Sequence, residues 1–270
     1  MPDAALIGVL ATAPTEVAPG SSWLGRPAIW LPRNAEPGDP ARTYQPPWRL
    51  VLARALVELC RLLPVLLAAT LLELVMVALE DIDVVDGLWW ASALGGTVLL
   101  AAGLVACLLT TVSKWLLVGR FRPGQHPLWC TFVWRNELYD CFVEELAVPW
   151  LMRLCYGSPL LNVWLRSLGA RIGRGVWCET HWLPETDLVR IGAGAAVNRG
   201  AVVQTHLFHD RLMQLDSVQV GAGATIGPHS IVLPGSKIGD GVTLGPASLV
   251  MRGEEIPAGT RWQGNPVSAW

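Results

Sequence analysis

The sequence predicts a left-handed parallel β-helix at the C-terminal end, preceded by a two-helix transmembrane hairpin and by amphipathic helices. Three observations lead to this prediction: a six-residue apolar period from residue 220 onward, two long apolar runs, and a mixed apolar and charged stretch before the repeats. A six-residue period fits neither the 3.6-residue repeat of a helix nor the two-residue repeat of a strand. It is typical of a short strand plus a turn, repeated three times in each coil of a β-helix.

The six-residue period keeps its phase over eight successive positions, and small or β-branched residues recur four places after the first five of them. The eight positions are Val220, Ile226, Val232, Ile238, Leu244, Val250, Ile256 and Trp262. Such residues stack inside a β-helix, while glycine takes the tight corners. An ordinary strand sandwich is disfavoured because its spacing would drift. Ile191, Val197 and Val203 predict an earlier coil, so we assign residues 169–270 to the β-helix domain.

The N-terminal residues resemble the end of the chain. The segment 17–28 and the segment 256–267 both begin with an aliphatic residue, continue through Gly and end in Trp-x-Gly-x-Pro. Since the second copy closes a β-helix, we predict that residues 1–31 form the closing turn of a preceding, truncated β-helix unit. Residues 32–49 are rich in proline and are predicted to form a linker.

Residues 50–118 predict a transmembrane hairpin with helices at about 56–79 and 88–115. The run 62–79 is interrupted only by Pro64, Thr70 and Glu73, and 88–112 contains no charged residue. Both are long enough to cross about 30 Å of hydrocarbon. The connector is acidic and the outer flanks are basic, so the positive-inside rule places the connector outside and the β-helix on the cytoplasmic face of the cell membrane.

Composition supports a membrane protein, because 52% of the residues are hydrophobic and the mean hydropathy is +0.40. A net charge of −2 gives no electrostatic basis for nucleic-acid binding. The six cysteines show no C-x-x-C spacing, so we predict no metal site and a reducing cytoplasm. Residues 119–168 predict amphipathic helices that lie at the membrane surface or pack under the β-helix, with a wholly buried core helix as the equal alternative.

The candidate catalytic residues lie where the period breaks, between Phe208 and Val220. We predict that His206 occupies a turn and acts as general base, since histidine there can take a proton from an attacking amine or hydroxyl. His209 and Asp210 are predicted to support it, with Asp210 or a backbone carbonyl fixing its tautomer. The predicted substrate-binding residues are Asn198, Gln204 and Arg211.

The alternative for this stretch is a solvated polar loop. The remaining histidines rank lower as candidates for chemistry: His229 lies on a regular corner, His126 lies in a Pro/Gly loop, and a structural role is favoured for His181.

Four runs carry a resemblance to a known family: 134–138, 168–173, 204–211 and 264–266. They resemble the C-terminal region of Pls/PosA-type nonribosomal peptide synthetases, which include the ε-poly-L-lysine synthetases, and the resemblance covers the whole chain. It implies tandem acetyltransferase-like β-helix domains that follow adenylation and carrier domains and link amino acids. It also implies a phosphopantetheine thioester or an acyl-CoA as the donor, and a trimer or pseudo-trimer of β-helix units.

Together these observations predict a membrane-anchored transferase that forms amide bonds in the synthesis of a poly-amino acid. Its expected partners are the membrane, upstream adenylation and carrier domains or a separate protein that supplies them, and other β-helix units. The competing hypothesis is a non-catalytic β-helix that serves as a scaffold or assembly module of a membrane synthetase.

Overall fold

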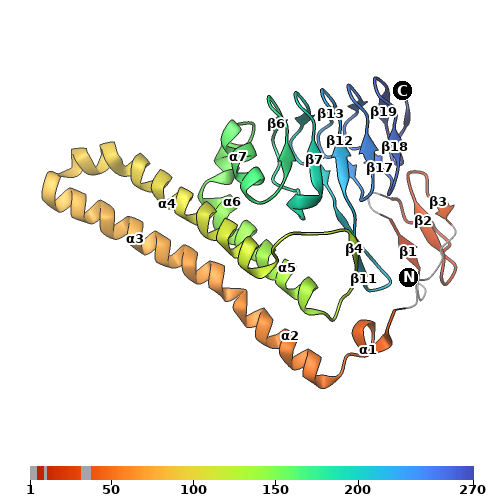
Figure 1. Ribbon diagram of the computed structural model, residues 1–270, viewed down its shortest axis with the longest axis horizontal. Coiled ribbons are helices and arrows are strands. Elements are labelled where there is room, and N and C mark those ends of the chain that lie inside the picture. Colours follow the sequence, from red (N-terminus) through yellow and green to blue (C-terminus); the bar gives the residue numbers. More distant parts are fainter. Residues whose placement is uncertain (1–4, 9–10, 32–37) are drawn as a thin grey trace.

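The computed structural model describes residues 5–8, 11–31 and 38–270, and Figure 1 shows a row of stacked coils flanked by long helices. A small N-terminal sheet comes first, the helices α1 to α7 follow, and the coils end the chain. The predicted linker at 32–49 therefore lies partly outside the described residues. Its described part includes the short helix α1 (Pro40–Thr43).

The C-terminal domain is a parallel β-helix, as the six-residue period predicts. Its three faces are the strand stacks β18-β15-β12-β7-β5, β20-β19-β16-β13-β8-β6 and β17-β14-β9. Apart from β20, which pairs antiparallel with β19, the strands pair in parallel at an offset of one coil, so that Val220 lies beside Ile238. The strands are β5 (Arg171–Ile172), β6 (Trp177–Cys178), β7 (Val189–Ile191), β8 (Ala196–Val197), β9 (Val202–Val203), β12 (Val218–Val220), β13 (Thr225–Ile226), β14 (Ile231–Val232), β15 (Lys237–Ile238), β16 (Thr243–Leu244), β17 (Leu249–Val250), β18 (Glu255–Ile256), β19 (Arg261–Gln263) and β20 (Ser268–Ala269).

The predicted inward positions form the core of the β-helix. Ile226, Val232 and Val250 are fully buried, and Ile238 is 3% exposed. Serine or alanine fills the space beside them: Ser230, Ser236 and Ser248 are also fully buried. The hydroxyls of Ser230 and Ser236 donate to backbone carbonyls of the next coil, and that of Ser248 donates to the Gly245 carbonyl in its own turn.

The break in the period is a β-hairpin that leaves the coil. Strands β10 (His206–His209) and β11 (Leu212–Leu215) pair antiparallel, and β11 also pairs with β4 (Gly124–Pro127). Asp210 and Arg211 form the tip with positive φ angles of 49° and 58°. The prediction that His206 occupies a turn is wrong, because the chain extends from residue 206 onward to pair with β11.

Two long helices precede the domain. α2 (Trp48–Cys60) leads into α3 (Leu62–Asp86), and α4 (Leu88–Leu117) runs back beside α3 (Figure 1). Both α3, with the helical residues before it, and α4 are long and apolar enough to cross a membrane. The predicted acidic connector is not a separate loop, since α3 stays helical through Asp86 and Gly87 alone joins the helices.

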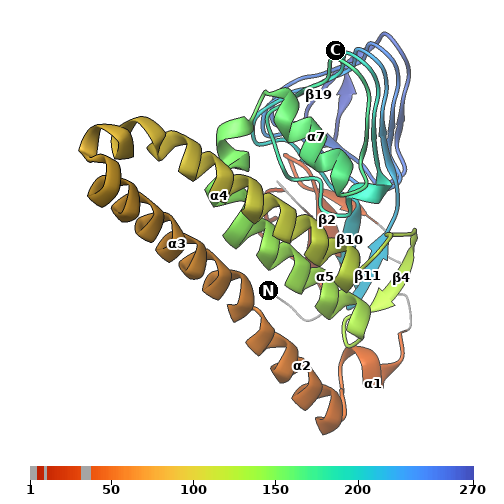
Figure 2. The same cartoon turned by 60° about the vertical axis from the view of Figure 1, so that its left-hand side comes forward.

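A layer of shorter helices fills the space between α4 and the first coils (Figure 2). It comprises α5 (Thr131–Phe142), the π-helical turn η1 (Val143–Ala147), α6 (Val148–Trp150), the 3₁₀ turn η2 (Met152–Cys155) and α7 (Pro159–Ser167). Trp134, Tyr139 and Trp164 of this layer share one hydrophobic core with the β-helix. Leu138, Phe142 and Leu146 pack on the other side against α3 and α4. Of the arrangements left open by the sequence, packing under the β-helix is the one observed.

A buried ion pair joins α4 to the domain. Lys114 near the end of α4 is fully buried, and its Nζ donates to Asp187 Oδ2 at 2.6 Å. The same carboxylate accepts the backbone N–H of Phe121 at 3.0 Å. Because separating a buried ion pair leaves an uncompensated charge, this contact holds α4 in one position relative to the coils.

The N-terminal sheet repeats the geometry of the last coil. β1 (Leu6–Ile7) pairs in parallel with β2 (Ser22–Leu24), which pairs antiparallel with β3 (Ile29–Leu31). β16, β19 and β20 follow the same order of pairing. The indole N–H of Trp23 donates to Ser21 at 2.9 Å, and that of Trp262 donates to Thr260 at 2.8 Å. The described part of residues 1–31 thus adopts the local structure of a β-helix end.

Candidate functional site

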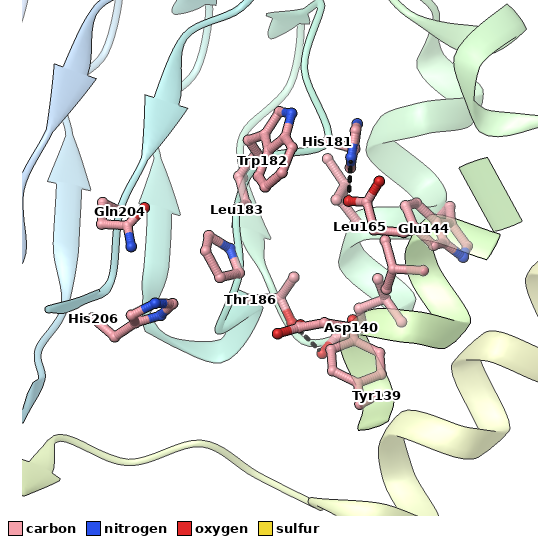
Figure 3. A pocket seen from close by; sticks show the side chains of 14 residues that line it. Tyr139, Asp140, Glu144, Leu165, His181, Trp182, Leu183, Thr186, Gln204 and His206 are labelled. Atoms are coloured by element: carbon pink, nitrogen blue, oxygen red, sulfur yellow. Dashed lines mark hydrogen bonds and ion pairs between the residues drawn. The ribbon is translucent and has the colours of Figure 1, made fainter. Parts of the chain in front are cut away.

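A cavity of about 330 Å³ lies between the helical layer and the first coils of the β-helix (Figure 3). Helical residues form one wall, and the irregular first coil together with the start of the β10–β11 hairpin forms the other. The lining residues are Tyr139, Asp140, Val143, Glu144, Trp164, Leu165, Leu168, His181, Trp182, Leu183, Pro184, Thr186, Gln204 and His206.

His206 and Glu185 form a hydrogen-bonded pair at this cavity. The Nδ1 atom of His206 lies 2.8 Å from Oε1 and 2.9 Å from Oε2 of Glu185. The Glu185 side chain is fully buried, whereas that of His206 is 16% exposed. A carboxylate accepts a proton but does not supply one, so neutral His206 carries its proton on Nδ1 and leaves Nε2 as the base.

Two further side chains hold the Glu185 carboxylate in place. The Thr205 hydroxyl donates to Oε2 at 2.5 Å, and the Asn136 amide donates to Oε1 at 3.0 Å. Both Thr205 and Asn136 are buried. Thr205 and Asn136 therefore orient Glu185, and Glu185 in turn orients His206. A histidine that acts as general base is typically oriented by a third group in this way.

The charges around the cavity shift two pKa values upward. Burial by itself lowers the pKa of His206, but the Glu185 hydrogen bond and the negative charges of Glu185 and Asp140 outweigh burial and raise it above the ordinary histidine value. Burial, aided by the charge of Glu185, raises the pKa of Asp140 to about 8. The raised pKa of His206 favours its role as a proton acceptor, because a stronger base takes a proton from an amine more readily.

A second histidine borders the same cavity. His181 Nε2 lies 2.9 Å from Glu144 Oε1, and the Tyr156 hydroxyl bonds its Nδ1. Glu144 belongs to the π-helical turn η1, a feature that is frequent at functional sites. Since both ring nitrogens of His181 are occupied, His206 is the better placed of the two to accept a proton.

The structure separates the residues that the sequence grouped around His206. Only Gln204 joins it at the cavity. His209 Nε2 pairs with Asp210 at 3.3 Å on the hairpin, so the prediction that Asp210 fixes the His206 tautomer is wrong, and Glu185 does so. The hairpin carries His209 and Asp210 away from the coil edge because β10 runs outward from residue 206.

The other two predicted substrate-binding residues have structural contacts. The guanidinium of Arg211 lies 5.0 Å from the ring centre of Tyr44, and its Nη1 donates to the Thr43 carbonyl at 3.5 Å. Arg211 thereby joins the hairpin tip to the segment around α1. The amide of Asn198 donates to the Ile226 carbonyl at 2.8 Å, within the stack of coils.

Sequence reasoning missed Glu185, Asp140 and Asn136. One signal for Glu185 existed, because the apolar positions Cys178 and Ile191 are thirteen residues apart and depart from the six-residue period. The residues of this first irregular segment include Glu185. In the structure Glu185 lies beside Thr205 and His206, which precede the second break in the period. No periodicity marks Asp140 or Asn136 as members of the site.

An apolar groove of about 300 Å³ adjoins the cavity. It is lined by Trp182, Val202, Gln204, Leu207, Ile231 and Leu233. Trp182 and Gln204 border both spaces, so the groove runs along the β9–β14 face of the β-helix up to the His206 site.

Comparison with known proteins supports the repeat assignment and the family resemblance. Residues 217–251 match the family described as bacterial transferase hexapeptide (six repeats). The chain is 37% identical over 279 aligned positions to the delta-poly-L-ornithine synthetase of Acinetobacter baumannii (strain AB307-0294). That alignment covers 100% of this chain and 21% of the synthetase, so the chain spans about a fifth of its relative. The resemblance to Pls-type synthetases inferred from the sequence is thereby confirmed.

Solved structures give weaker similarities. The serine acetyltransferase of Neisseria gonorrhoeae matches with a TM-score of 0.34 and 15% identity, over 74% of this chain and 66% of that one. A galactoside acetyltransferase in complex with coenzyme A matches with a TM-score of 0.31 and 18% identity, over 40% of this chain and 68% of that one. These TM-scores are too low to assign a reaction to this chain.

Proposed function

We propose that this chain, which resembles a poly-ornithine synthetase over its whole length, is a membrane-anchored transferase unit that forms amide bonds in poly-amino-acid synthesis. The observation that carries the proposal is the His206–Glu185 pair at a cavity, with the orientation of Glu185 fixed by Thr205 and Asn136. A scaffold would gain little from a buried carboxylate, because burying a charge is costly unless a function or a strong partner compensates for it.

In the proposed reaction an acceptor amine attacks the carbonyl carbon of a thioester donor. Nε2 of His206 takes a proton from the attacking nitrogen, and the resulting imidazolium is stabilised by Glu185. The C–S bond then breaks, the amide forms, and the sulfur leaves as a thiol after receiving the proton from His206. Atoms and charges balance, and His206 returns to its neutral state.

The donor is proposed to be a phosphopantetheine thioester or an acyl-CoA, used as a co-substrate. The apolar groove beside Leu207 and Ile231 suits the largely uncharged arm of such a thioester, and it leads to the cavity at Gln204. Gln204 would offer an amide group to the polar atoms of that arm. Adenylation and carrier domains, in the same polypeptide or in a partner protein, would load the donor.

The proposal extends to the membrane anchor and to the N-terminal segment. Residues 50–118 would anchor the chain in the cell membrane as a two-span hairpin, with the β-helix on the cytoplasmic face. Residues 1–31 would close a preceding β-helix unit. In support of this proposal, Leu24 packs against Leu233 and Leu249 of the β-helix domain.

The test is the replacement of His206 by Gln in a full-length synthetase supplied with its activated amino acid. We expect amide formation to fall by about 10²–10⁴, as for the loss of a general base. His229→Gln is the matched control, because His229 lies on an exposed corner of the coils and should retain the parental rate. Both variants should keep the parental melting temperature. A His206→Gln enzyme with parental turnover would refute the proposal and favour the scaffold.

A further inference from the structure

The cavity has an acidic wall opposite His206. Figure 3 shows Asp140 and Glu144 entering from the helical side, and His206 and Gln204 from the β-helix side. Among the described residues that line the cavity there is no lysine or arginine. The two carboxyl groups therefore have no fixed basic side chain beside them in the cavity, apart from the two histidines.

Asp140 and Glu144 differ in how they are held. Glu144 is bound by His181, which is itself held by Tyr156. The Asp140 carboxyl makes no hydrogen bond or ion pair with another described residue, although it is close enough to Glu185, His206, Glu137 and Glu144 for their charges to act on it. Asp140 is half-buried, and a carboxyl group that is partly removed from water without a partner is costly unless a ligand provides one.

The rest of the wall is aromatic and aliphatic. The side chains of Tyr139, Trp164 and Trp182 line the cavity together with the two carboxyl groups. Aromatic faces attract ammonium groups, and carboxylates form strong charge-assisted hydrogen bonds with them. This combination suits a cation, whereas an anionic ligand would be repelled by Asp140, Glu144 and the nearby Glu185.

We propose that Asp140, supported by Glu144, is the residue that binds the charged ammonium group of an amine acceptor with two amino groups. One amino group is held as the ammonium ion at Asp140, while the other, uncharged, presents its lone pair for attack and its proton to Nε2 of His206. This inference rests on the proposed function for the reaction, but it assigns a binding residue that can be tested without turnover.

The experiment measures binding of 1,4-diaminobutane to the whole 270-residue chain in detergent, by calorimetry or by tryptophan fluorescence, with 1,4-butanediol as the uncharged analogue. The parent should bind the diamine more tightly than the diol. Asp140→Asn should weaken diamine binding about tenfold or more, as for the loss of a hydrogen bond to a charged group. Asp240→Asn is the matched control, because Asp240 lies on an exposed corner of the coils, and it should bind like the parent.

Two additional measurements keep the inference separate from the catalytic proposal. In the His206→Gln background the diamine should still bind, even though turnover is lost. In that background the affinity should rise with pH as Asp140 ionises, at or above the parental pKa of about 8, because the His206 charge that lowers this pKa is absent. Alkylammonium groups stay charged up to a pKa of about 10.4. The other titratable groups near Asp140 are unchanged when Asp140→Asn is added to the His206→Gln protein; they are Glu185, Glu137, Glu144, Tyr139 and His181. A pH effect that disappears on this addition is therefore assigned to Asp140.

Asp140→Glu retains the charge and should bind the diamine better than Asp140→Asn. This comparison separates the loss of the charge from a change in the packing around residue 140. Parental diamine affinity in a folded Asp140→Asn protein would overturn the inference. Equal affinity of the parent for the diamine and the diol would overturn it as well. Failure of the catalytic test with normal diamine binding would refute the reaction and leave this binding site in place.

Discussion

Replacing Glu185 by Gln tests whether the buried carboxylate makes His206 a base. In the parent, Oε1 contacts Asn136 and His206, and Oε2 contacts Thr205 and His206, so both oxygens accept hydrogen bonds. Glutamine keeps the size of the side chain but offers a single acceptor oxygen and an NH₂ donor. It cannot accept from all three neighbours, and it removes the negative charge beside the imidazole.

The expected effect on activity is large and the effect on stability is moderate. A mispositioned or wrongly protonated base costs about 10²–10⁴ in rate. Because the Thr205 hydroxyl can rotate, at most one buried donor should lose its partner, which corresponds to a loss of about 1–3 kcal/mol in the free energy of unfolding. Amide formation in the full-length synthetase measures the first effect, and thermal unfolding measures the second.

The pH dependence gives a second readout. In the folded parent the pKa of His206 is raised above the unfolded value, because Glu185 and Asp140 favour the charged ring. The stability from this interaction is fully present below the unfolded histidine pKa of about 6.5, and it is lost as the pH rises through the folded pKa. In Glu185→Gln this loss should shrink, and the acidic limb of the pH–rate profile should move to lower pH. Parental turnover with an unshifted acidic limb would refute the role of Glu185.

Two further predictions concern the fold and the membrane. Ile238→Asp should unfold the β-helix, because Ile238 is 3% exposed and stacks between Val220 and Ile256. An unpaired buried carboxylate there is strongly destabilising. An unchanged melting temperature would contradict this prediction. Single cysteines at residues 82–86 should react with a membrane-impermeant thiol reagent added outside intact cells, whereas absence of labelling, with labelling restored after permeabilisation, would exclude the predicted orientation.

The acidic end of α3 shows which features of the helices a local charge pattern can predict. The charge pattern correctly separated the apolar runs, and both fall on helices of spanning length. It also suggested a loop at 80–86, but the chain stays helical to Asp86. The reason is that acidic residues interrupt hydrophobicity without interrupting backbone hydrogen bonding, while Gly87, with a φ of 89°, is what ends the helix.

By itself, the sequence determined the β-helix, its register and the place where a hairpin leaves it. Each coil contacts the next at a constant offset, so the spacing along the chain maps directly onto contacts in space. It also pointed to His206, because a break in that spacing is visible without a structure. Only the tertiary structure decided the chemistry around it. Asp140 and Asn136 come from α5 and Glu185 from the first coil, and they meet at His206 through helix packing that has no period in the sequence.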